Sequence, residues 1–257
     1  MQILFRAVVS LSCLLMCRLS DAQIPLRVLT YNIHVCRGLD QKLDVPRIAE
    51  AIRNLEPDVV FLQEVDFNTK RTEGVDQTNE LARLTGLQGK FSPAIPLQGG
   101  HYGQAVLSRF PLKNSIIHKL DGEPGAEQRI AAEHEIDVEG QRVIIATVHL
   151  VHDNDESRLK QAHQLKTIFG GRKHPVIIGG DFNAKPESPV MDLFRQGWTG
   201  VDSVQGPSFP ANKPRIRLDY VLINDSDKLS IKEQKIINEP VASDHLPVLS
   251  VIDLRAK

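Results

Sequence analysis

Short apolar runs separated by polar turns make up most of the chain from residue 23 onward. Runs rich in Val, Ile, Leu and Phe that stop after a few residues are typical of buried strands and are too short for helices. On this basis we expect strands at residues 25–35, 58–65, 104–108, 113–118, 130–137, 142–151, 175–178, 216–223, 231–237 and 248–254.

A few segments have helical spacing instead. In residues 43–58 the apolar positions fall on one helical face, Asp44 can cap the start and Pro57 stops the helix. Residues 157–171 give the clearest helical pattern, and Gly170 is placed to end it. Two shorter helices are expected, at residues 79–84 and 190–195.

The order of these elements indicates the fold class. Many short strands with only a few helices between them favour an α/β fold of two packed sheets with helices on the outside, rather than one doubly wound parallel sheet. No internal repeat and no long Gly, Ser or Pro linker divides the sequence. We therefore expect a single domain at residues 23–257.

The first 22 residues have a different pattern. Arg6 precedes an apolar stretch at residues 7–17, and small residues at Ser20 and Ala22 follow it. This is the layout of a secretory signal peptide cleaved after Ala22, and the stretch is too short to span a bilayer comfortably. We expect a secreted or periplasmic protein with no transmembrane segment in the mature chain; an uncleaved N-terminal anchor is the open alternative.

Composition narrows the possible partners. The 257-residue chain is 41% hydrophobic and 25% charged, as in globular proteins, and its formal net charge is −1. That balance does not support tight non-specific binding of nucleic acid by bulk charge, although bound metal ions can supply local positive charge in a nuclease. Cys36 alone would remain after cleavage, so the mature chain cannot form an internal disulfide.

Polar side chains follow many of the apolar runs, and these are the candidates for chemistry. Read singly, each is a turn residue, a cap or a satisfied core histidine. Taken together, so many polar and charged side chains at the ends of apolar strands would be costly to remove from water unless they were paired or bound to a cation. Carboxylate and amide oxygens suit Mg²⁺, Mn²⁺ or Ca²⁺. His34 and Cys36 could be zinc ligands, but two such residues without partners make only a weak case for a zinc site. The candidates are Asn32, Glu64, His149, Asp181, Asn183, Asp219, Asp244 and His245.

Seven motifs in order carry a resemblance to a known family. They are "TYNIH", "PDVVFLQEVD", "GQAVLSRFP", "ATVHL", "GGDFNAKP", "RLDYVLI" and "SDHLPV". Together they resemble the endonuclease/exonuclease/phosphatase superfamily, which includes deoxyribonuclease I, abasic-site endonucleases, neutral sphingomyelinases and inositol polyphosphate 5-phosphatases. The resemblance spans residues 26–254. It implies a four-layer α/β sandwich of two packed mixed β-sheets, like deoxyribonuclease I, with the site at one edge of the facing sheets.

The resemblance also implies a metal site. Glu64 would be the principal ligand, Asn32 its neighbour on the metal or the phosphate, and Asp244 a supporting ligand. The metal would be Mg²⁺, with Mn²⁺ or Ca²⁺ as alternatives. The sequence departs from the nuclease branch at His34, where nucleases often carry an acidic or amide residue, and this puts a second metal in doubt.

Catalytic roles follow from the same resemblance. Asp181 and Asn183 would orient the attacking water and the phosphoryl oxygens, and Asp219 would pair with His245 and fix its tautomer. Further contacts to the phosphoryl group are implied for His149, as hydrogen-bond donor or general acid, and for Arg129.

The function implied is that of a secreted, metal-dependent phosphohydrolase. A phosphodiesterase acting on a lipid headgroup or another small phosphoester is favoured, and we expect a monomer. An extracellular endonuclease or exonuclease acting on nucleic acid is the alternative enzyme. A catalytically silent binding module is the alternative outside enzymes, because a fold alone does not establish activity.

Overall fold

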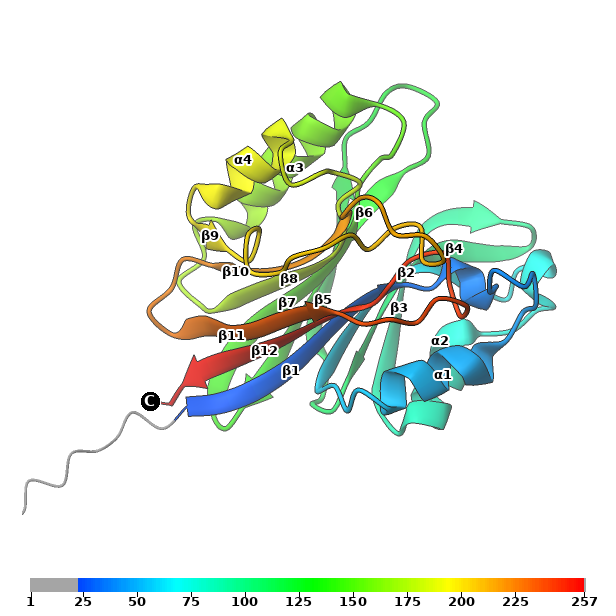
Figure 1. Ribbon diagram of the computed structural model, residues 1–257, viewed down its shortest axis with the longest axis horizontal. Coiled ribbons are helices and arrows are strands. Elements are labelled where there is room, and N and C mark those ends of the chain that lie inside the picture. Colours follow the sequence, from blue (N-terminus) through cyan, green and yellow to red (C-terminus); the bar gives the residue numbers. More distant parts are fainter. Residues whose placement is uncertain (1–22, 257) are drawn as a thin grey trace, which may run out of the picture.

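Two six-stranded sheets form the centre of the computed structural model, which describes residues 23–256 (Figure 1). The predicted signal peptide, residues 1–22, lies outside the described residues. In order across the first sheet, the strands are β11 (Leu229–Ile236), β12 (Val248–Arg255), β1 (Gln23–Asn32), β2 (Val59–Phe67), β4 (Gly100–Ser108) and β3 (Gln88–Leu97). Across the second they are β5 (Lys113–Leu120), β6 (Arg129–Val138), β7 (Gln141–His149), β8 (Val176–Asp181), β10 (Asp219–Asn224) and β9 (Trp198–Thr199).

Helices cover the outer face of each sheet. Figure 1 shows α1 (Val45–Arg53) and α2 (Gln77–Thr85) beside the first sheet, and α3 (Asp155–Phe169) and α4 (Pro189–Arg195) beside the second. The expected cap is present, since the Asp44 side chain accepts a hydrogen bond from the Arg47 amide at the start of α1. The part of the chain that the structure describes has no helix long and apolar enough to cross a membrane.

Alternating side chains of the strands build three apolar cores. Along β1, Leu26 and Val28 lie in the core between the two sheets, whereas Leu29 and Tyr31 pack on the side of α1 and α2. A third core lies between the second sheet and its two helices. The sheets meet so closely that a Cβ added to Gly179 of β8 would lie 2.1 Å from Phe61 Cδ2 of β2. This layering is the predicted four-layer α/β sandwich.

Two strands were not predicted, one was predicted too early, and the strand expected at residues 25–35 ends at Asn32, with a 3-10 helix at His34–Cys36 after it. β3 contains two prolines, which argue against a strand, but it lies at the edge of its sheet, where a missing N–H costs no ladder bond. β9 has only two residues. The strand predicted at residues 216–223 begins at Asp219, and Ile216 makes only an isolated bridge to Phe209.

Candidate active site

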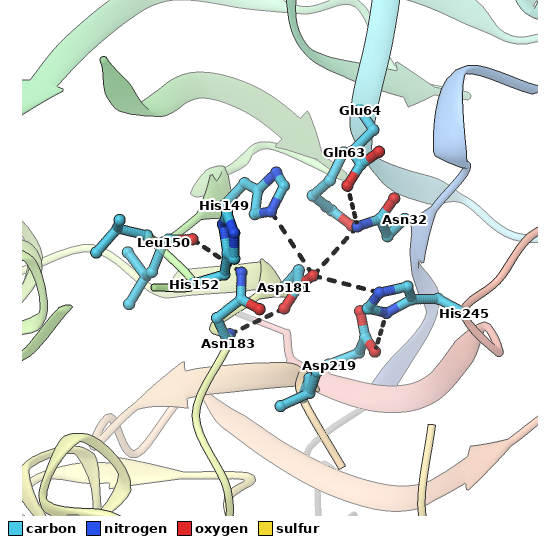
Figure 2. A network of polar contacts seen from close by, with 12 residues as sticks. Asn32, Gln63, Glu64, His149, Leu150, His152, Asp181, Asn183, Asp219 and His245 are labelled. Atoms are coloured by element: carbon cyan, nitrogen blue, oxygen red, sulfur yellow. Dashed lines mark hydrogen bonds and ion pairs between the residues drawn. The ribbon is translucent and has the colours of Figure 1, made fainter. Parts of the chain in front are cut away.

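The sheet topology brings the expected polar residues to one edge of the sandwich. β1 runs parallel to β2, and β7 runs parallel to β8, so the ends of these strands lie at the same edge. Asn32, His149 and Asp181 are the last residues of β1, β7 and β8. Asp181 pairs in register with His149 on one side and with Asp219 on the other. Figure 2 shows the resulting cluster, with His245 reaching it from the loop before β12.

Asp181 is the centre of this cluster. One carboxylate oxygen, Oδ2, accepts a hydrogen bond from Asn32 Nδ2 at 3.1 Å and lies 3.7 Å from the Nε2 atoms of both His149 and His245. The other accepts one from the Asn183 amide at 2.8 Å. Burial, followed by the charge of Asp219, raises the pKa of Asp181 to about 7. A carboxylate of this kind can take up a proton near neutral pH.

His245 and Asp219 form a buried pair. Asp219 Oδ2 lies 2.9 Å from His245 Nδ1 and accepts a second hydrogen bond from Ser208 Oγ at 2.6 Å. Burial alone would lower the pKa of His245, but the carboxylates of Asp219 and Asp181 outweigh it and raise this pKa to about 10. His245 is therefore a cation at neutral pH, and its Nε2 atom faces Asp181.

His149 is the opposite case. It is 5% exposed, and burial, followed by the charges of Arg129 and His245, lowers its pKa well below the ordinary value. The site thus holds one charged and one neutral imidazole at neutral pH. The neutral ring can donate or accept a hydrogen bond without adding charge.

Glu64 is turned into the site by a β-bulge. Gln63 and Glu64 of β2 together oppose the single residue Gln104 of β4, and Glu64 has a left-handed backbone with φ of 57°. Asn183, on the loop after β8, also has positive φ, at 49°. Non-glycine residues in this conformation are uncommon, and a β-bulge is one of the places where they occur.

Asn32 joins Glu64 to Asp181. Its Nδ2 group donates to Glu64 Oε1 and to Asp181 Oδ2, each at 3.1 Å, while its Oδ1 atom accepts from the His34 amide. In this arrangement the amide oxygen is engaged by the backbone. The contact to the two carboxylates is made through the NH₂ group, so Asn32 holds two anions together.

The remaining expected residues lie around this cluster. Asn183 Nδ2 donates to the Leu150 carbonyl at 2.9 Å. Arg129 is buried next to His149 in one small cavity, and its Nε has no hydrogen-bond partner among the described residues. Asp244 is half-buried and lies beside His34, with 4.0 Å between Oδ1 and Nδ1. The described contacts place it next to His34 rather than on Glu64 or Asn32.

The donor set fits a divalent cation bound by oxygen. Three carboxylates, those of Glu64, Asp181 and Asp219, gather here, and the Asp219 Oδ1 atom is buried without a hydrogen-bond partner among the described residues. Carboxylate oxygens of Asp181 and Asp219 lie within 4.8 Å of each other, and His245, the third group of this cluster, is protonated and is therefore not a ligand. Oxygen donors with a surplus of negative charge suit Mg²⁺, Mn²⁺ or Ca²⁺.

A buried chain of amide and hydroxyl groups supports the site from beneath, and the sequence did not point to it. Gln63 Nε2 donates to Thr147 Oγ1 at 3.0 Å, Thr147 donates to Gln104 Oε1 at 2.9 Å, and Gln104 Nε2 donates to the Ile130 carbonyl. This chain links the two sheets at positions next to or near Glu64, His149 and Arg129. Its only signal in the sequence is polar residues inside otherwise apolar strands.

Comparisons with known proteins agree with this architecture. The sequence profile of the Endonuclease/Exonuclease/phosphatase family matches residues 29–245. The chain is 24% identical to the uncharacterized protein YbhP of Escherichia coli (strain K12), over 90% of this chain and 98% of YbhP.

Two solved structures are also similar. An endonuclease/exonuclease/phosphatase from Beutenbergia cavernae DSM 12333 superposes with a TM-score of 0.79 at 26% identity, covering 90% of this chain and 72% of the other. The human Nocturnin catalytic domain with bound sulfate anion gives a TM-score of 0.72 at 25% identity, covering 90% of this chain and 94% of that domain.

Proposed function

The chain belongs to the endonuclease/exonuclease/phosphatase family, and from this premise we propose that it is a divalent-metal-dependent phosphodiesterase acting on a small phosphoester such as a lipid headgroup. Members of the family act on phosphoesters. The observation that carries the proposal is the convergence of Asn32, His149 and His245 on the buried carboxylate of Asp181. The sulfate anion bound by the human Nocturnin domain has the tetrahedral shape of a phosphate group and supports it.

The side chains divide the work of phosphodiester hydrolysis. Such an ester is an anion that repels nucleophiles, and its leaving alkoxide is a strong base. A bound divalent cation, held by Glu64, would neutralise charge on the phosphoryl oxygens. Asp181, with a pKa of about 7, takes the proton of the attacking water, and Asn183 orients that water.

The two imidazoles act on the phosphoryl group. His245 is cationic and contributes charge and a hydrogen bond through Nε2, while Asp219 holds its Nδ1 atom. His149, which is neutral at neutral pH, donates a hydrogen bond to a phosphoryl or leaving oxygen. Arg129 lies beside His149 and pairs with Glu127 at 3.3 Å; its Nε, which has no hydrogen-bond partner among the described residues, is the donor it offers to a phosphoryl oxygen.

Metal-stimulated hydrolysis by the purified protein tests the proposal. We expect Mg²⁺-dependent release of p-nitrophenol from bis-p-nitrophenyl phosphate, abolition by EDTA and recovery when Mg²⁺ or Mn²⁺ is added back. Glu64→Gln should lose this activity, while Glu50→Gln, at an exposed position on α1, should keep it.

Other outcomes would change the assignment. Activity confined to p-nitrophenyl phosphate or phosphorylcholine would make the protein a monoesterase, and a higher kcat/KM on DNA would make it a nuclease. A folded protein that binds phosphate but hydrolyses none of these esters would be a binding module. Export after cleavage at Ala22 and a monomeric state stay predictions, to be tested by N-terminal sequencing of the secreted protein and by sedimentation.

A further inference from the structure

A groove leads away from the candidate active site beyond Asn183. Its first cavity has a volume of about 460 Å³ and lies between the loops that follow β7 and β8 and the segment before β10. A second cavity of about 510 Å³ continues it and shares Lys185, Glu187 and Ile216 with the first. Each volume falls within the usual range of small-molecule sites, about 300–1,000 Å³. Asn183 lines the first cavity, so the groove begins at the edge of the site.

The groove carries an excess of positive charge. Two of its arginines are neutralised by neighbours, since Arg195 pairs with Asp202 and Arg158 pairs with Asp155. With these two ion pairs set aside, the charged side chains that remain unpaired decide which ligands the groove can bind.

The remaining charges are three cations and one anion. Lys185 and Arg215 line the groove, and the described residues give neither side chain an ion-pair or hydrogen-bond partner. Arg217 is 6% exposed, binds the carbonyls of Val201 and Val204, and has a buried Nε without a hydrogen-bond partner among the described residues. Glu187 is the one carboxylate of the groove that lacks an ion pair in the described part of the chain.

The apolar part of the groove is small. Ile216 spans both cavities, and Leu218 and Ala184 line the first. This floor can support a short carbon skeleton but offers no extended apolar surface for an acyl chain. The chemistry of the groove therefore favours a compact, charged ligand.

We infer that this groove binds a second anionic group of the substrate, a phosphate or a carboxylate, with Lys185 and Arg215 as its main contacts. The inference rests on the proposed function for the position of the scissile ester, next to Asp181 and Asn183. It narrows the substrate class to small phosphoesters with two anionic groups. Charge-assisted hydrogen bonds at a partly exposed site should favour such a substrate by about tenfold.

A matched pair of chromogenic diesters tests the inference. Thymidine 5′-(p-nitrophenyl phosphate) has one phosphate, and its 3′-phosphorylated form adds only the second anionic group. We expect the wild-type protein to prefer the 3′-phosphorylated ester by about tenfold in kcat/KM, mainly through KM. The double variant Lys185→Ala/Arg215→Ala should lose this preference, while Lys173→Ala, an exposed lysine at the opposite end of β8, should keep it.

Binding measured by titration calorimetry tests the groove independently of whether the protein hydrolyses esters. Thymidine 3′,5′-bisphosphate should bind more tightly than thymidine 5′-monophosphate, and the double variant should remove the difference, even if neither ester is hydrolysed. In that case the proposed function fails and the groove assignment stands. Equal binding of the two nucleotides by the wild-type protein, or a preference that survives in the double variant, would overturn the assignment.

Discussion

Replacing Asp219 with Asn should separate the chemistry of the site from its stability. The change keeps the shape of the side chain and removes its negative charge. In the wild-type protein, Asp219 Oδ2 holds His245 Nδ1 at 2.9 Å, and the carboxylate is fully buried. The amide can no longer stabilise a cationic imidazole, so the pKa of His245 falls.

The expected magnitude follows from the contact that is lost. A hydrogen bond to a charged group is worth about 1.5–3 kcal/mol, which corresponds to about a 10- to 150-fold loss in kcat if it is made fully in the transition state. Two effects on stability oppose each other. Asp219 has a buried oxygen without a partner among the described residues, and its charge raises the pKa of Asp181, so removing that charge relieves repulsion between two buried carboxylates. The same change breaks the buried pair with His245, which is destabilising, so Tm should fall only modestly.

The assay is kcat on the best ester together with thermal unfolding of the same preparation. Asp227→Asn, at an exposed position between β10 and β11, is the matched control and should change neither quantity. Turnover within about twofold of wild type in Asp219→Asn would refute the role given to the pair. A loss of activity accompanied by a large drop in Tm would show that Asp219 acts through folding instead.

Three further predictions concern stability. Gly179→Ala should lower the free energy of unfolding by about 2 kcal/mol or more in urea titrations, because the new Cβ would lie 2.1 Å from Phe61 Cδ2; an unchanged midpoint would contradict the close approach of the sheets. Burial, then the charge of Lys90, lowers the pKa of His134 to about 4 from 6.5, so stability should be complete above pH 6.5 and fall by up to about 3 kcal/mol toward pH 4; a His134→Gln variant should show a shallower slope. Thr147→Val removes the hydroxyl that bonds two buried amide groups, so Gln63 Nε2 loses its acceptor and Gln104 Oε1 loses its donor, and the free energy of unfolding should fall by about 2 kcal/mol. A variant as stable as wild type would show that the buried chain is dispensable.

The strands and helices were largely readable from local patterns. Alternating and continuous apolar runs gave the strands of both sheets, and a capping aspartate with a one-sided apolar pattern gave α1. The strand β3 was not predicted because prolines are tolerated only in an edge strand, and which strand lies at an edge depends on the whole sheet. The late start of β10 likewise depends on pairing with β8, which local propensity does not encode.

The site was readable only in part. Polar residues at strand ends marked candidates, and the resemblance assigned them roles, but their contacts join residues far apart in the chain, such as Asn32 and Asp181, 149 positions apart. The opposite charge states of His149 and His245 depend on burial and on which carboxylate each ring faces. The cations of the groove beyond Asn183 could not be identified either, because ion pairing decides which arginines remain free.

The backbone at Glu64 shows how this fold gives up stability to place two consecutive side chains in different surroundings. Left-handed backbone costs a residue other than Gly, Asn or Asp roughly 1–2 kcal/mol, and a glutamate has no side-chain feature that reduces this cost. A regular β2 strand would avoid the strain but would remove the bulge that sets Gln63 and Glu64 against one residue of β4. With the bulge, Gln63 bonds Thr147 of the facing sheet while Glu64 reaches Asn32 at the site edge. The backbone strain at Glu64 is therefore the local cost of an arrangement in which two consecutive residues make contacts in different places, Gln63 in the core and Glu64 at the site.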